Sequence, residues 1–90
     1  MHHVLFYDYV DDILERRGPY REAHLAHAET ACEAGTLRFL GALGDPVSGA
    51  LGVFRAGVEE IEGFVADDPY VKAGLVTAHR IEPWTVAVGE

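Results

Sequence analysis

The stretch LRFLGALGDPVSGALGVFRA, residues 37–56, contains two apolar runs joined by a turn. Residues 37–43 and 51–56 are short, rich in leucine, valine and phenylalanine, and bounded by glycine, which is typical of β-strands. The intervening GDPVSG, residues 44–49, consists of the residue types that tight turns require. The stretch therefore predicts a β-hairpin, with one further strand and one helix on each side of it.

The chain before the hairpin predicts a strand and then a helix. Residues 2–9 (HHVLFYDY) are rich in valine, phenylalanine and tyrosine, which strands favour. Gly18 and Pro19 break the chain, and Pro19 suits the first position of a helix that continues to about Ala34. Gly35 ends this helix, because glycine adopts the left-handed conformation that commonly closes helices.

The chain after the hairpin predicts a helix and then a strand. The second helix opens at Gly57, and its apolar residues are spaced to share one helical face. Asp68 and Pro69 end it, and the last strand lies within residues 76–88. The order β-α-β-β-α-β is typical of the α+β, ferredoxin-like sandwich, in which two helices cover one face of a four-stranded antiparallel sheet. We expect a single domain, residues 1–90.

Both faces of the predicted sheet carry apolar residues. On the second strand, regular alternation places Leu37 and Phe39 on one face and Leu40 on the other. The two helices can cover only one face, and a second copy of the chain is the simplest cover for the other. The sequence therefore predicts a homodimer packed sheet to sheet.

Composition argues against several classes of partner. The net charge is −8, from 15 acidic and 7 basic residues, and basic residues adjoin only at Arg16 and Arg17. We therefore expect no nucleic-acid partner and no binding to anionic membranes. Cys32 is the only cysteine, which excludes an intramolecular disulfide and favours a reducing, cytoplasmic location. No signal peptide is expected, and no apolar run reaches the roughly 18 residues that a membrane span needs.

Two histidines lie on the first predicted helix. A helical wheel places His24 near the middle of the inward face, among alanines, and His27 at the edge of that face. His24 is either a satisfied core residue or a base beside a pocket that its small neighbours leave open. A zinc site needs a third and usually a fourth ligand, and no spacing of histidine or cysteine supplies them, so we predict no metal.

Asp68, Arg21 and Ser48 each have two interpretations. Asp68 precedes a proline, so it either caps a short helix or orients an imidazole from across the fold. Arg21 lies one turn before His24 on the same face and either forms a structural ion pair or binds a substrate carboxylate or oxyanion. The Ser48 hydroxyl lies in the hairpin, where turn formation explains it equally well. The residues alone leave these alternatives open.

Five short motifs are spread along the chain: VLFYDY in the first strand, RxxHL at residues 21–25, FLGALGDP before the turn, DPYVxAGL at residues 68–75 and IxPW at residues 81–84. Together they resemble the YCII-related domain family over nearly the whole length of the chain. The resemblance implies a dimeric α+β barrel and an active-site dyad formed by His24 and Asp68. It assigns no role to His27.

The predicted function is a small cofactor-independent enzyme. His24 would transfer a proton in an elimination, isomerisation or hydrolysis of a small molecule, with a cyclic or aromatic one favoured. Asp68 would hold the imidazole, and Arg21 would bind an anionic oxygen. The remaining predicted substrate contacts are Tyr7, Phe39, Phe54 and Ser48. The alternatives are a non-catalytic domain that binds or senses a small molecule in the same pocket, and a polyphenol oxygenase, since the same fold hosts such enzymes.

Overall fold

The computed structural model describes residues 1–89, which form strands and helices in the predicted order, including the short helix expected after Asp68, with one further short helix added. The strands are β1 (His2–Tyr9), β2 (Leu37–Leu43), β3 (Gly49–Phe54) and β4 (Val76–Trp84). The helices are α1 (Ile13–Arg16), α2 (Gly18–Glu33), α3 (Val58–Asp67) and α4 (Pro69–Lys72).

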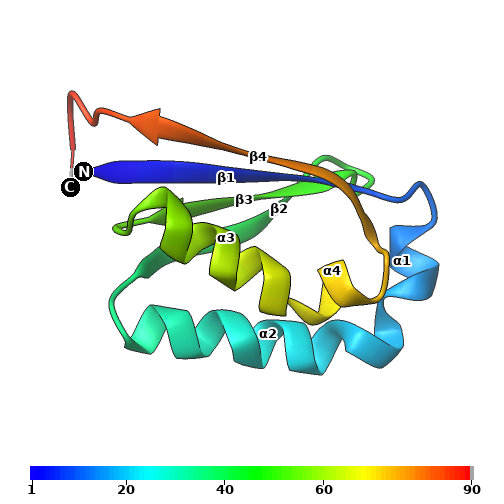
Figure 1. Cartoon of the computed structure of the whole chain (residues 1–90). Coiled ribbons are helices and arrows are strands. Elements are labelled where there is room, and N and C mark those ends of the chain that lie inside the picture. Colours follow the sequence, from blue (N-terminus) through cyan, green and yellow to red (C-terminus); the bar gives the residue numbers. More distant parts are fainter. Residues whose placement is uncertain (90) are drawn as a thin grey trace.

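The strands form one antiparallel sheet in the order β2-β3-β1-β4, with β1 and β3 in the middle. Figure 1 shows α2, α3 and α4 together beneath one face of this sheet. The predicted α+β, ferredoxin-like class is confirmed. The third strand begins two residues earlier than predicted, because Gly49 already pairs with Asp8 of β1 and Leu43 of β2.

Helix α1 lies where a simple break was predicted. Ile13, only 1% exposed, packs with Tyr70 and Leu75 in a small core of its own, which anchors the connection between β1 and α2. The backbone N–H of Arg17 donates to the Ile13 carbonyl at 2.9 Å, so α1 leads almost directly into α2. Within residues 1–89, no helix has the length and apolar character that a membrane crossing requires.

The main core lies between the sheet and the helices. It is built from side chains of the sheet and of the helices α2 and α3: Leu5, Tyr7, Ala28, Leu37, Ala50, Phe54, Ile61, Phe64 and Val65. Helix α2 contributes only the small Ala28 to this cluster, and its other buried residue is His24. A histidine is therefore enclosed where a larger apolar residue would normally fill the interior.

A β-bulge moves Phe39 to the outer face of the sheet. Leu37 pairs with Phe54, but Phe39 pairs with Val53, so the register shifts between Leu37 and Phe39. Leu37 is buried beneath the helices, whereas Phe39 is 73% exposed. The prediction that Leu37 and Phe39 share a face is wrong, because the extra residue of a bulge reverses the alternation that follows it.

Candidate active site

Asp68 lies at the junction of α3 and α4 and is fully buried. Its Oδ1 atom accepts a hydrogen bond of 2.9 Å from the backbone N–H of Tyr70, which caps α4. Pro69 occupies the first position of α4, where a missing N–H has no cost. The capping interpretation of Asp68 is therefore correct, and the cap also holds the carboxylate in one orientation.

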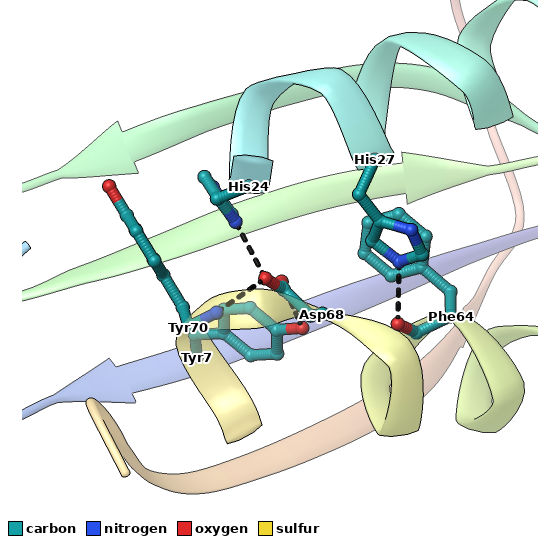
Figure 2. Close-up of polar contacts among 6 residues, drawn as sticks. All are labelled: Tyr7, His24, His27, Phe64, Asp68 and Tyr70. Carbon is teal, nitrogen blue, oxygen red and sulfur yellow. Dashed lines mark hydrogen bonds and ion pairs between the residues drawn. The ribbon is translucent and has the colours of Figure 1, made fainter. Parts of the chain in front are cut away.

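The same carboxylate contacts two further side chains, from β1 and α2 (Figure 2). The Tyr7 hydroxyl donates to Oδ2 at 2.8 Å, and Nδ1 of His24 lies 2.8 Å from Oδ1. An ionised carboxylate can only accept hydrogen bonds, so all three of its partners must donate. We therefore place a proton on Nδ1 of His24. Nε2 is then the unprotonated nitrogen of the neutral ring, and it has no hydrogen-bond partner within residues 1–89.

Tyr70 holds the plane of the His24 ring. The two rings are stacked with centroids 3.7 Å apart and an angle of 4° between their planes. His24 is 5% exposed and Tyr70 is 2% exposed, so neither ring has room to turn. Among the described residues, the Tyr70 hydroxyl is the one buried side-chain polar atom without a hydrogen-bond partner.

A cavity of about 360 Å³ lies beside His24 between α2 and the sheet. This volume is at the lower end of the range for small-molecule sites. Its lining consists of Tyr9, Arg17, Arg21, His24, Leu25, Leu40, Gly41, Ala42, Val47 and Ala50. The polar and charged groups come from the end of β1 and the first turns of α2, and the apolar ones mainly from β2, β3 and their connection.

Of the predicted binding residues, only Arg21 lines this cavity together with His24. Phe54 is buried in the core against Phe64, with ring centroids 5.1 Å apart, and Phe39 lies on the opposite face of the sheet. The prediction that these two rings line the pocket is wrong: alternation reveals which face a residue takes, but neither the bulge nor how deep its ring is packed.

Tyr7 and Ser48 are also absent from the lining of the cavity. The Tyr7 ring is 1% exposed, and its hydroxyl is taken up by Asp68. The Ser48 carbonyl accepts from the N–H of Tyr9, and its neighbour Val47 lines the cavity instead. Tyr7 thus holds the Asp68 carboxylate by a hydrogen bond and does not line the cavity, and Ser48 belongs to the turn.

Arg17 is a cavity residue that the sequence interpretation missed. It precedes the predicted helix start at Pro19, so a helical wheel of the predicted helix does not include it. The spacing Arg17, Arg21, His24 is i, i+4, i+7, which places all three on one helical face and could have identified it. In the structure, Arg17 is the N-cap residue of α2 and has helical backbone angles, so it lies on the same face as Arg21 and His24.

His27 is separated from this group. Its Nε2 donates to the backbone carbonyl of Phe64 at 2.9 Å, and its ring stacks on the Phe64 ring with centroids 4.4 Å apart. Figure 2 shows the two histidines of α2 directed to different partners, Asp68 for His24 and Phe64 for His27. Within residues 1–89, no three histidine, cysteine, aspartate or glutamate side chains are grouped as metal ligands would be.

Tyr7 makes the stability of the fold depend on alkaline pH. Burial raises the pKa of the Tyr7 phenol far above its ordinary value of 10.0, and the negative charge of Asp68 and its hydrogen bond raise it further. Below pH 10 the phenol is protonated in both states, so it adds no pH dependence there. Above pH 10 the unfolded chain loses this proton and the folded chain keeps it, so stability falls as pH rises.

We expect the Tyr7→Phe variant to lose this dependence. In the wild type, Tyr7 should lower the free energy of unfolding by about 1.4 kcal/mol for each pH unit above its ordinary pKa. The variant should be less stable at neutral pH by about 1 kcal/mol, because one hydrogen bond to Asp68 is lost, but its alkaline slope should be shallower. Urea unfolding across the alkaline range measures both slopes, and equal slopes would contradict the prediction.

The solved structures with a similar fold include an enzyme and a structured domain. A 5-chloro-2-hydroxyhydroquinone dehydrochlorinase from Burkholderia phenoliruptrix, solved in complex with 2,5-dihydroxybenzoquinone, is 26% identical, has a TM-score of 0.80 and is matched over 94% of both chains. The structured domain of BMY-1 from Caenorhabditis elegans is 16% identical with a TM-score of 0.56, and covers 98% of this chain and 100% of its own. The second likeness shows the fold alone. No curated protein matches the sequence.

The sequence itself matches a family over most of its length. The model of the YCII-related domain covers residues 1–85 of the 90-residue chain. The resemblance inferred from the five short motifs is confirmed, and the dehydrochlorinase shows that a small-molecule enzyme occurs among similar structures. The chain belongs to the YCII-related domain family.

Proposed function

We propose that the protein is a cofactor-independent enzyme that transfers a proton on a small cyclic or aromatic molecule, with Nε2 of His24 as the base. The observation that carries this proposal is the chain of contacts from Tyr7 through Asp68 to Nδ1 of His24. This chain of contacts is buried at Tyr7 and Asp68 and reaches the cavity at His24. Nε2 of His24 has no hydrogen-bond partner within residues 1–89, and its ring lines the cavity, so it is available to take a proton from a bound molecule.

In the proposed reaction, Nε2 of His24 takes a proton from a hydroxyl group or an activated carbon of the substrate. In an elimination, the leaving group is on a saturated carbon of the keto tautomer of the ring. The electron pair left behind moves into the ring and forms a new double bond as the bond to the leaving group breaks, and the leaving group departs as an anion. Asp68 accepts from Nδ1 throughout, so its charge stabilises the imidazolium that forms. Arg21, on the same cavity wall, binds an anionic oxygen of the substrate.

The choice of a ring compound as substrate is supported by the similar dehydrochlorinase, which acts on a chlorinated hydroxyhydroquinone. Its match extends over 94% of both chains at 26% identity, so the likeness includes nearly all of that chain. Elimination is therefore the reaction type that we favour over isomerisation and hydrolysis. A non-catalytic domain that binds or senses the same kind of molecule is the second candidate, because the cavity alone supports binding.

Turnover separates the two candidates. The wild-type protein is mixed with an excess of 5-chloro-2-hydroxyhydroquinone, the substrate named for the similar enzyme, and released chloride is measured over time. An enzyme releases many chloride ions per protomer, above the rate in buffer alone. If binding saturates but chloride release never exceeds the rate in buffer, the elimination is excluded for this compound and the binding domain is favoured.

The acidic chain supports a small molecule, rather than nucleic acid, as the partner. The net charge is −8, and the basic residues are too few to neutralise a series of phosphates. Cys32 is the only cysteine, which supports a reducing compartment such as the cytoplasm as the place where the enzyme works.

We further propose that the protein forms a homodimer through the outer face of the sheet. This face carries a groove lined by Val4, Phe6, Leu51, Val53, Arg80, Glu82, Pro83 and Trp84. Beside the groove, Phe39 is 73% exposed, and Trp84 is 45% exposed. A largely apolar sheet surface of this kind is commonly covered by a partner, and a second copy presents the same surface by two-fold symmetry.

The Phe39→Glu variant tests the dimer. Because Phe39 is mostly exposed in a single copy, the charge costs little in a monomer but would be buried between two sheets. We expect the wild type to sediment at about twice the 9.8 kDa of one chain, and the variant at 9.8 kDa at the same micromolar concentration. Leu14→Glu is the control, since Leu14 is 50% exposed but lies on α1. A monomeric wild type would contradict the proposal.

A further inference from the structure

The cavity beside His24 also indicates the chemical class of the substrate. We propose that the substrate is a ring compound with a carboxylate substituent, and that Arg17 and Arg21 bind this carboxylate together. The inference rests on the proposed function, because it uses the same cavity as the substrate site. It adds Arg17 as a substrate-binding residue, and it assigns to the arginine pair a group that the substrate carries before any reaction begins.

Arg17 and Arg21 have no carboxylate partner within residues 1–89, although the protein is strongly acidic. The chain has 15 acidic side chains for 7 arginines and lysines, so most cations could find a carboxylate. Arg16 lies 3.5 Å from Asp12, and Arg80 lies 3.6 Å from Glu82. Within residues 1–89, neither Arg17 nor Arg21 forms an ion pair, although both line the same cavity. Two free guanidinium groups on one cavity wall are suited to bind an anion.

Arg17 and Arg21 place positive charge at the N-terminal end of α2, where a helix favours negative charge. The N-terminal end of a helix carries a partial positive charge and favours acidic residues, as α3 illustrates with Glu59 and Glu60 in its first turn. The first turn of α2 has no acidic residue, and Arg17 occupies its cap position without a side-chain capping bond. Repulsion at this helix end is relieved when an anion binds there.

The polar groups of the cavity point independently to a ligand. Nε2 of His24 belongs to a side chain that is 6% exposed, and it lacks a partner within residues 1–89. Burial raises the pKa of the Tyr9 phenol, while the charges of Arg17 and Arg21 oppose that rise, so both guanidinium groups lie within electrostatic range of Tyr9. Tyr9 lines the cavity as well, so donors, cations and the base converge on one space.

The opposite wall defines the rest of the ligand. Leu40, Ala42 and Ala50 from the sheet, with Val47 from the turn, form an apolar surface across from the arginines. A space of about 360 Å³ with one cationic and one apolar wall fits a single substituted ring better than a flexible or strongly hydrated anion. A carboxylate is planar, and guanidinium groups bind it with paired hydrogen bonds. These features together select a ring carboxylate.

Binding of gentisate, a dihydroxybenzoate, and of its neutral amide gentisamide tests the inference. The two compounds share one ring and differ in the carboxylate, and their affinities are measured by calorimetry or NMR titration. We expect the wild type to bind gentisate at least about tenfold more tightly than gentisamide. Arg17→Gln should weaken gentisate binding by about 10–100-fold and leave gentisamide binding unchanged. Arg21→Gln should do the same.

Arg16→Gln is the matched control, because Arg16 is the adjacent residue, pairs with Asp12 and does not line the cavity. It should leave the affinity for both compounds unchanged. Equal affinities of the wild type for the two compounds, no detectable gentisate binding, or equal effects of Arg16→Gln and Arg17→Gln would each overturn the inference. Binding without turnover of any tested compound would leave the arginine pair in place and count against the proposed enzyme.

Discussion

His24→Asn is expected to lower turnover by about 10²–10⁴-fold, the usual contribution of a general base. Asparagine suits the test because its amide N–H₂ can take the place of Nδ1–H and donate to Asp68, so the buried carboxylate keeps its partner. The variant has no group in the position of Nε2 that could take a proton. The rate is measured with saturating substrate, so that a change in affinity does not contribute.

The second histidine of α2 provides the control for this experiment. His27→Gln places an amide nitrogen near the position of Nε2, where it can still donate to the Phe64 carbonyl. Because His27 does not line the cavity, its variant should turn over substrate at the wild-type rate. Wild-type turnover by His24→Asn would refute the assignment of the base, and an equal loss in both variants would indicate damage to α2 instead.

The difference between these histidines could be predicted from the sequence because it depends on local geometry. One hundred degrees per residue suffices to place His24 inward and His27 at the edge of the helix face. The likeness of the motifs DPYVxAGL and RxxHL to a known family added Asp68, which lies 44 positions away from His24. No periodicity could have brought those two side chains to 2.8 Å, since that distance depends on how α2 packs beside α4.

The errors concern tertiary features that alternation does not encode. Phe39 was placed in the pocket because a regular strand was assumed, and one bulge reverses its face. Tyr7 is predicted to contact the substrate, but its hydroxyl donates to Asp68 instead, which no sequence pattern reveals. The sequence pattern does not identify Arg17, because no helix is predicted before Pro19. In the structure, Arg17 lies between the end of α1 and the start of α2 and therefore has helical backbone geometry.

Asp68→Ala is expected to have the largest effect on stability of any single substitution in the site. It removes the acceptor of three donors at once: the Tyr7 hydroxyl, Nδ1 of His24 and the N–H of Tyr70. Breaking a buried interaction of this kind costs about 3–5 kcal/mol, because the remaining polar groups stay buried without partners. The free energy of unfolding of a native protein is about 5–15 kcal/mol in total, so urea unfolding should show that the variant is barely folded. A loss below about 1 kcal/mol would contradict the burial of this network.

Asp68→Asn separates the charge of the carboxylate from its hydrogen bonds. The backbone N–H of Tyr70 can only donate, so the amide oxygen must take the position of Oδ1, where it also accepts from His24. The amide N–H₂ then faces the Tyr7 oxygen, which can accept in turn. Most of the network survives, and the fold should be much more stable than that of Asp68→Ala.

Turnover by Asp68→Asn should nevertheless fall, because the imidazolium formed at His24 no longer has a negative charge beside it. A charge-assisted hydrogen bond is worth about twice a neutral one, so we expect a loss of about 10–100-fold at saturating substrate. Urea unfolding of the same preparation shows whether the fold is retained. If the variant is stable and fully active, Asp68 acts only as the cap of α4. If it is as unstable as Asp68→Ala, the assigned orientation of the amide is wrong.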